Sequence, residues 1–278
     1  MINTSLKNIS NKSFALSMRF FHNPILKTNA LIHTDVSLLL QHVHYGHQEQ
    51  AESLLKNKPH LIYKAGRVTD FSNRTFQDIT VFQSSLWTRD WTMWEMILQY
   101  MPHEEARKQL MTLEKNQTEY GAYFDFHELI DTLTTYLAHF DTWTCYQLGK
   151  HWCEVIGGAQ TRAVAHVANQ LCHPYRSHIP IPDFMEASLP RSFDLAGENN
   201  FFPLKPYPAG VLGKDFAVFR WNKDRAGIGT MKPCPNARVT AETDLATMIA
   251  LENRCHTKLA ELKASLGLEP TSSKRNTL

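Results

Sequence analysis

The sequence predicts an all-α, mainly helical fold, in which helix–turn–helix units stack and continue into a second helical region with an irregular proline-rich wrap. Three observations predict it. Residues 35–59 align without a gap with residues 78–102, and a duplicated unit is typical of stacked repeats. Further along the chain, apolar residues recur at helical spacing. Nine of the thirteen prolines then fall between positions 174 and 235, where they exclude a long helix or a central strand.

Each copy of the repeat predicts two helices joined by a polar turn and stopped by a proline. The turn falls at Gly46 in the first copy and at Arg89–Asp90 in the second. Glycine readily takes the left-handed conformation that ends a helix. With its Gly-His-x-Glu turn and its paired leucines, the first copy resembles an ankyrin unit. This resemblance implies an ankyrin-like stack over residues 35–116, with an inserted finger.

The connection between the two copies is longer than the usual ankyrin connection. We expect residues 66–76 to form a hairpin-like finger with its turn at Ser72-Asn73, since serine and asparagine favour turns. A charged helix over residues 103–116 follows the second copy. Its polar composition indicates a cap that shields the end of the stack.

Further helices are expected in the second half of the chain. Apolar spacing predicts a helix from about residue 126 to 140. Asp141 is a candidate N-cap for an aromatic-rich helix that stops at Gly157-Gly158, and a third helix covers 160–171. A last helix runs over 242–266 and ends at Gly267. The chain divides into a partly ordered leader, the repeats, a second helical region, a proline-rich wrap and a C-terminal helix with a polar tail, over residues 1–34, 35–116, 120–175, 176–239 and 240–278.

Composition restricts the classes of function. A formal net charge of +2 over 278 residues gives no indication of a nucleic-acid partner. The five cysteines are odd in number and contain no CxxC, which indicates reduced thiols in a cytosol-like compartment. No apolar run reaches the roughly 18–20 residues that span a bilayer. His42, His44 and His47 lie close together, but the paired spacing of a structural zinc site is absent. We therefore expect neither a metal nor a cofactor.

Several segments carry a wider resemblance. Residues 66–96 contain Val-Thr-Asp-Phe-Ser-x-Arg-Thr-Phe and Ile-Thr-Val-Phe-Gln-x-x-Leu-Trp, and His-Trp-Cys at 151–153 and Cys-His-Pro at 172–174 follow. Together with matches as far as residue 250, they resemble the ankyrin-like effectors that Legionella and related intracellular bacteria inject through a type IV secretion system. The resemblance implies a virulence protein of the bacterial cytosol that is translocated into the host cytoplasm, or a regulator of another effector. It supplies no catalytic motif.

The leading hypothesis is a protein–protein interaction module without enzymatic activity, which binds a host protein or another bacterial effector. Three tryptophans within eight residues exceed what a short helix pair normally buries, and tryptophan, tyrosine and arginine dominate interface hot spots. We expect one of these tryptophans, together with the finger, to anchor the partner. The candidate contacts are Arg67, Asp70, Phe71, Arg74, Phe76, Trp87, Arg89, Asp90 and Trp91.

Two other interpretations remain open. The first is a cysteine-dependent enzyme that modifies a host target, with Cys153 as nucleophile and His151 or His166 as base; in the competing interpretation Cys153 is a small core residue. The second concerns a basic stretch, which is either a solvated loop or a contact for an acidic protein or an anionic membrane surface. Its residues include Lys205, Lys214, Arg220, Lys223 and Arg225.

Overall fold

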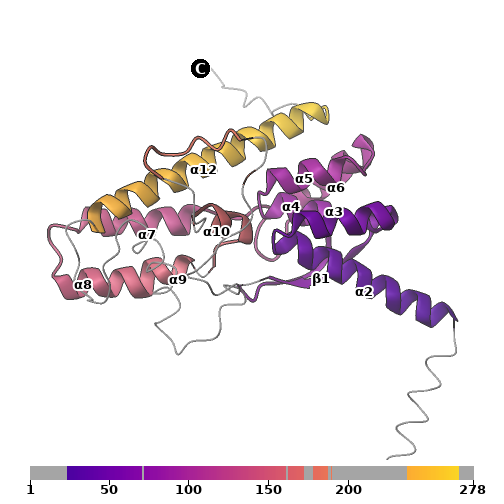
Figure 1. Cartoon of the computed structure of the whole chain (residues 1–278), viewed down its shortest axis with the longest axis horizontal. Coiled ribbons are helices and arrows are strands. Elements are labelled where there is room, and N and C mark those ends of the chain that lie inside the picture. The colour runs from indigo at the N-terminus through magenta and orange to yellow at the C-terminus, as the bar shows by residue number, and fades with distance from the viewer. Residues whose placement is uncertain are drawn as a thin grey trace, which may run out of the picture.

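The computed structural model describes residues 24–70, 72–160, 162–171, 178–186, 189 and 237–268 (Figure 1). Over these ranges the protein is mainly helical, with one two-stranded sheet. The prediction of a mainly helical protein is thereby confirmed. The leader up to residue 23, the basic stretch and the polar tail lie outside the described residues. No helix in the described part of the chain is both long and apolar enough to cross a membrane.

The two copies of the repeat form two helix pairs that lie side by side. The first pair is α2 (Pro24–His44) and α3 (Gln48–Asn57), and the second is α4 (Val81–Trp87) and α5 (Trp91–Leu98). Helix α2 packs against α4, and α3 packs against α5. Helix α2 begins before the repeat does, so the duplication defines the packed part of that helix rather than its length.

The turns of the two pairs have the same backbone geometry. The N–H of His47 donates to the carbonyl of His42 at 2.8 Å, and the equivalent N–H of Asp90 donates to the carbonyl of Ser85 at 3.1 Å. Such a bond closes a helix whose next residue is left-handed. The left-handed residues are Gly46 (φ 71°) and Arg89 (φ 57°). The repeated unit therefore keeps its hydrogen bonds although an arginine replaces the glycine.

The predicted finger is a β-hairpin that lies on α2. Strands β1 (Ala65–Thr69) and β2 (Thr75–Thr80) pair antiparallel, with an irregularity between Gly66 and Val68. The turn contains Asn73 in the left-handed conformation (φ 61°), as expected for asparagine. Glycine is required at position 66 by close approach, because a Cβ there would lie 2.6 Å from Cγ1 of Val36.

After the second pair comes α6 (His103–Asn116), which has the predicted bounds and packs against α4. The first proline stop, Pro59, instead begins the short 3-10 helix η1 (Pro59–Tyr63). The remaining elements are α7 (His127–Ala138), α8 (Cys145–Lys150), η2 (His151–Ile156), α9 (Gly157–Gln160), α10 (Ala165–Leu171) and α12 (Ala237–Ser265).

Two predictions about the second helical region are wrong. The N-cap of α8 is Thr144, whose hydroxyl accepts from the N–H of Gln147 in a capping box, and not Asp141. The helical chain then runs through η2 and α9 instead of stopping at Gly157-Gly158. Gly157 keeps right-handed helical angles (φ −61°, ψ −38°) and is buried. Packing around the buried Gly157 thus keeps the chain helical, and the next helix starts at Ala165 rather than at residue 160.

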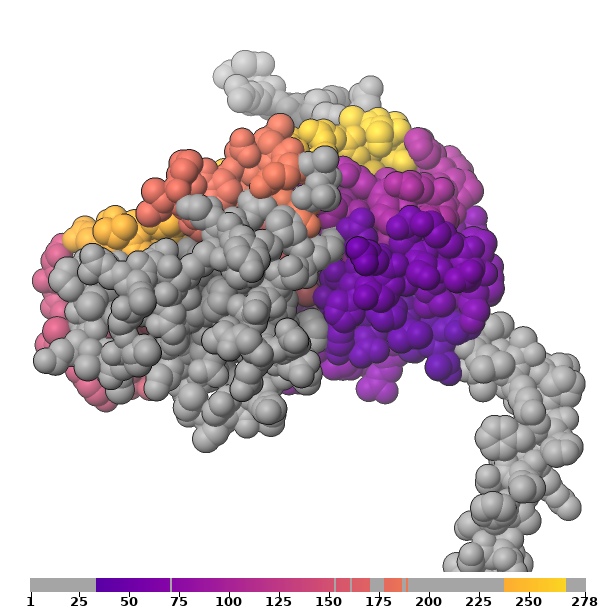
Figure 2. All heavy atoms as spheres, viewed as in Figure 1, coloured from indigo at the N-terminus to yellow at the C-terminus, as the bar shows by residue number. Residues whose placement is uncertain are grey.

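Helix α12 connects the two halves of the protein. It packs against α7 and α5 and buries its predicted apolar stripe in a core shared with the helix pairs. Near its start Arg238 pairs with Asp141 at 2.8 Å, and further along Lys258 pairs with Glu95 of α5 at 3.0 Å. Residues 178–186 are irregular, as the proline-rich wrap predicts, and lie on α12 (Figures 1 and 2), where Phe184 is buried and its carbonyl accepts from Arg254.

Candidate interaction surface

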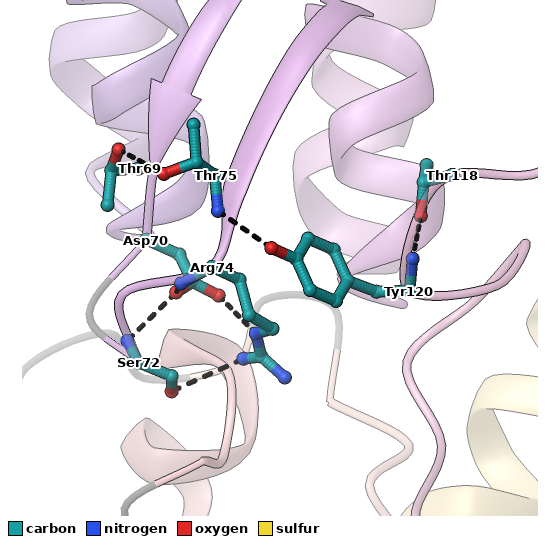
Figure 3. Close-up of polar contacts among 7 residues, drawn as sticks. All are labelled: Thr69, Asp70, Ser72, Arg74, Thr75, Thr118 and Tyr120. Atoms are coloured by element: carbon teal, nitrogen blue, oxygen red, sulfur yellow. Dashed lines mark hydrogen bonds and ion pairs between the residues drawn. The ribbon is translucent and has the colours of Figure 1, made fainter.

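The polar residues of the finger are used to build its turn. The buried carboxylate of Asp70 accepts from the N–H groups of Ser72 and Arg74 at 2.8 and 2.9 Å, and from Nε of Arg74 at 2.7 Å (Figure 3). The side chain of Asp70 is only 5% exposed. The acceptor oxygens of Asp70 therefore face the chain itself, and its contact with a partner stays a prediction. Of the other finger residues, Arg67 is exposed and Phe71 lies outside the described residues.

The predicted aromatic anchors are in the core. The side chains of Phe76, Trp87 and Trp91 are each 1% exposed. Phe76 packs edge-on against Trp87, with ring centroids 4.7 Å apart, and the guanidinium of Arg74 lies 4.9 Å above the ring of Trp87. These side chains are therefore internal: His44, Phe76 and Phe124 pack on Trp87, and His166 packs on Trp91. Their contact with a partner stays a prediction that their exposure does not support.

A histidine completes this aromatic cluster. The ring of His44 lies 4.9 Å from that of Phe76, and its side chain is fully buried. Burial, with a further contribution from the positive charge of Arg74, lowers the pKa of His44 to about 3. Neither ring nitrogen has a hydrogen-bond partner within the described part of the chain. The imidazole is therefore neutral at physiological pH and acts as an aromatic core residue.

The Arg89–Asp90 turn docks on the second half of the chain. Nε of Arg89 donates to the carbonyl of Phe124 at 3.0 Å, and the carbonyl of Arg89 accepts from the thiol of Cys255 in α12 at 3.6 Å. The carboxylate of Asp90 caps α5 by accepting from the N–H of Met93. Asp90 is buried and Arg89 is half-buried in this internal contact, so a contact of either residue with a partner stays a prediction.

The two histidines of the cysteine-enzyme hypothesis have different surroundings. The ring of His166 lies edge-on to Trp91, 4.8 Å between centroids, and its Nδ1 is 3.8 Å from Asp90. Nε2 of His151 instead lies 3.0 Å from the carbonyl of Thr132 in α7. The side chain of Cys153 lies outside the described residues. His166 therefore belongs to the core under the turn, and His151 to the packing of η2 on α7.

A groove between the hairpin and α6 is open. It has a volume of about 300 Å³ and is floored by Gln109, which is 5% exposed. The amide of Gln109 accepts from the hydroxyl of Thr80 at 2.5 Å and donates to the carbonyl of Ile62 at 3.3 Å and to Glu105 at 2.9 Å. We call this feature the hairpin groove. The side chains that line it include Tyr63, Asp78, Thr80, Gln83, Glu105, Lys108, Gln109, Thr112, Asn116 and Thr118.

The rim of the hairpin groove carries both signs of charge. Asp78 of β2 and Lys108 of α6 are exposed, and Tyr63 is 49% exposed. Helix α12 contributes no side chain to the lining, so the C-terminal helix leaves this groove uncovered. Sequence reasoning missed these residues. A signal existed in Gln109, a polar residue in the stripe that α6 buries with Ala106 and Leu110.

Known proteins place the second half of the chain in a family. Residues 128–266 match the CBUA0006 C-terminal domain family. The chain belongs to that family. The uncharacterized protein CBUA0006 of Coxiella burnetii (strain RSA 493 / Nine Mile phase I) is 34% identical over 257 residues, which cover 80% of this chain and 72% of that protein. No solved structure matches. The CBUA0006 C-terminal domain begins in α7 and ends just after α12. It therefore contains the helix that docks on the repeat pairs.

Proposed function

We propose that the protein is a protein–protein interaction module with an ankyrin-like stack, acting as an effector translocated into the host cytoplasm or as a regulator of another effector. The observation that supports it best is the hairpin groove, because it is a preformed concave surface that α12 leaves open. Its walls are regular elements, and sites on such elements need little reorganisation on binding. The bacterial source of the relative agrees with this setting.

The groove suits an extended peptide segment of mixed charge. The side-chain amide of Asn116 offers both a donor and an acceptor to a peptide backbone, whereas that of Gln83 is already hydrogen-bonded to Thr80 and Gln109. Asp78 on one wall and Lys108 on the other offer charges of both signs to a bound segment, and Lys108 also lies 3.7 Å from Glu105 of its own helix. Because the floor amide of Gln109 is already hydrogen-bonded, the polar floor is rigid rather than unsatisfied.

The decisive experiment is a quantitative pull-down from host and bacterial lysates with the full chain and two variants. Thr112→Arg places a long side chain in the groove, whereas Met111→Arg makes the same change at an exposed neighbour on α6 that does not line it. We expect a stoichiometric partner that wild type and Met111→Arg retain and Thr112→Arg loses.

Two results contradict the proposal. A partner that Thr112→Arg still retains binds elsewhere, which excludes the groove as the site. The absence of an enriched protein in both lysates argues against a stable interaction module. Circular dichroism of both variants checks that the exposed substitutions leave the fold unchanged.

A further inference from the structure

Two histidine rings face each other at the turn between α2 and α3. His42 lies in the last turn of α2 and His47 directly precedes α3. Their Nδ1 atoms are 3.4 Å apart, and their ring centroids are 5.7 Å apart. The backbone bond from His47 to His42 brings the two residues together. His47 is exposed and His42 is half-buried, and the atoms of α2 and α3 form an open surface in Figure 2 (indigo).

The internal repeat shows that the turn does not need this histidine pair. The equivalent positions in the second unit are Ser85 and Asp90, which form the same backbone bond. There, Asp90 caps the following helix with its carboxylate. His47 occupies the N-cap position of α3 but makes no side-chain capping bond. Its imidazole is directed to His42 instead, so the pair has a geometry that the fold of the turn does not explain.

The separation of the two nitrogens fits a tetrahedral zinc ion. Two ligands at a Zn–N distance of about 2.0–2.1 Å in tetrahedral geometry lie about 3.3–3.4 Å apart. The observed distance between the Nδ1 atoms is 3.4 Å. Square-planar or octahedral geometry would bring adjacent nitrogens to about 2.9 Å at a similar bond length, so the pair fits Zn²⁺ better than Cu²⁺ or Ni²⁺.

The pair has one state with a metal and another without it. A metal binds the lone pair of a neutral imidazole nitrogen, so both Nδ1 atoms must be without a proton when the ion is bound. Without a metal, the same short distance is a hydrogen bond in which one Nδ1–H donates to the other nitrogen.

We propose that His42 and His47 form a two-imidazole zinc site at the α2–α3 turn. When zinc binds, the ring that carried Nδ1–H takes the Nε2–H tautomer, so two neutral rings donate their Nδ1 lone pairs without net proton release. His42 also lines a shallow groove of about 360 Å³ with Leu38, Glu49 and Leu54. Within the described ranges no group of three or more His, Cys, Asp or Glu is assembled. Water or a bound molecule therefore supplies the remaining ligands.

The test is calorimetric titration of metal-free full chain with ZnCl₂. The variants are His42→Gln and His47→Gln, with the exposed His60→Gln and His103→Gln as controls that also remove one of the fourteen histidines. We expect one binding event that both site variants weaken at least about tenfold, since even an outer partner of a metal ligand contributes that much. Both control variants retain it.

A second readout does not depend on heat. Zinc at saturating concentration raises the melting temperature of wild type and of the controls but not of the site variants, because only the folded turn holds both ligands. Identical isotherms for wild type and His42→Gln overturn the proposal. So does a loss of binding in only one of the two site variants, which indicates a single histidine acting with a different group.

Discussion

At the scale of single residues, the buried His44 makes the stability of the folded protein depend on pH. Its pKa falls from 6.5 to about 3 on folding because of burial. In the unfolded chain the ring takes up a proton as pH drops below 6.5, whereas the folded protein excludes that proton until about pH 3. Stability therefore decreases as pH falls through this window and is unaffected by His44 above it. Arg74, which lies over the adjacent Trp87, adds a like charge that opposes protonation.

We predict that His44→Leu makes the protein less sensitive to acid. Wild type loses on the order of 1.4 kcal/mol per pH unit from this group between about pH 6 and pH 4, and the variant lacks that slope. Urea unfolding at a series of pH values measures the free energy of unfolding of both proteins. In the difference between the two values, the contributions of all other titrating groups cancel. The exposed His60→Leu serves as the control. Parallel stability curves for wild type and His44→Leu would show that the ring is not held neutral.

Residue type alone could not show whether the predicted contact residues are exposed or buried. Tryptophan is common both at interface hot spots and in the packed faces of helices, so the tryptophans of residues 87–91 fit either an exposed or a buried position. Asp70 is likewise of a residue type that is found at binding surfaces, but its carboxylate forms an Asx turn within the hairpin. By contrast, the chemistry of the turns was predictable, because Gly46 and Asn73 are residue types that tolerate a positive φ.

At the scale of elements, the packing of the hairpin on α2 depends on Gly66. A Cβ at this position would lie 2.6 Å from Cγ1 of Val36 and 3.1 Å from Cδ1 of Leu40. Both neighbours are buried, and valine has few alternative rotamers. Gly158 in α9 is the opposite case. Among the described residues, no atom lies within 4 Å of the place that an alanine methyl group would take there.

We predict opposite effects for two glycine-to-alanine changes. Gly66→Ala destabilises the protein by about 1–3 kcal/mol through overpacking, and Gly158→Ala stabilises it by about 0.5–1 kcal/mol because alanine favours the helix. Urea unfolding of each variant against wild type gives both values. Equal stability of the two variants would mean that β1 does not approach α2 as closely as described.

The bounds of elements were predictable where local signals agreed. The proline before α6 marked the start of that helix, and the charged run that follows it predicted the same bounds as the structure has. The glycines at 157–158 led to the wrong prediction of a helix end, because a glycine pair favours a break unless tertiary packing holds it helical. The buried side of α9 supplies that packing, with Ala159 and Gln160 at 1% and 4% exposure.

At the scale of the whole molecule, α12 makes the repeat pairs and the family domain share one core. Cys255 lies at the centre of this contact, 1% exposed, and its thiol donates to the carbonyl of Arg89. Burial raises the pKa of the Cys255 thiol well above its ordinary value. The reactive thiolate is therefore scarce while α12 stays docked.

We predict that Cys255 reacts with iodoacetamide only when the protein unfolds. In a variant with serine at the other four cysteines, labelling should follow global unfolding as measured by far-UV circular dichroism across a urea series. A matched variant that keeps only the exposed Cys145 labels without unfolding. Rapid labelling of Cys255 in a folded protein would show that α12 detaches on its own.

The sequence by itself determined the helical class, the two similar helix pairs, their turns, the hairpin between them and the apolar stripe of α12. These features follow from local chemistry: side-chain periodicity, capping residues and residues that tolerate a positive φ. Only the tertiary structure decided that Trp87, Trp91 and the Arg89–Asp90 turn are internal, that the hairpin groove stays open, and that His42 and His47 meet. The physical reason is that burial depends on which surfaces distant segments cover, and α12 is separated from that turn by more than a hundred residues of chain.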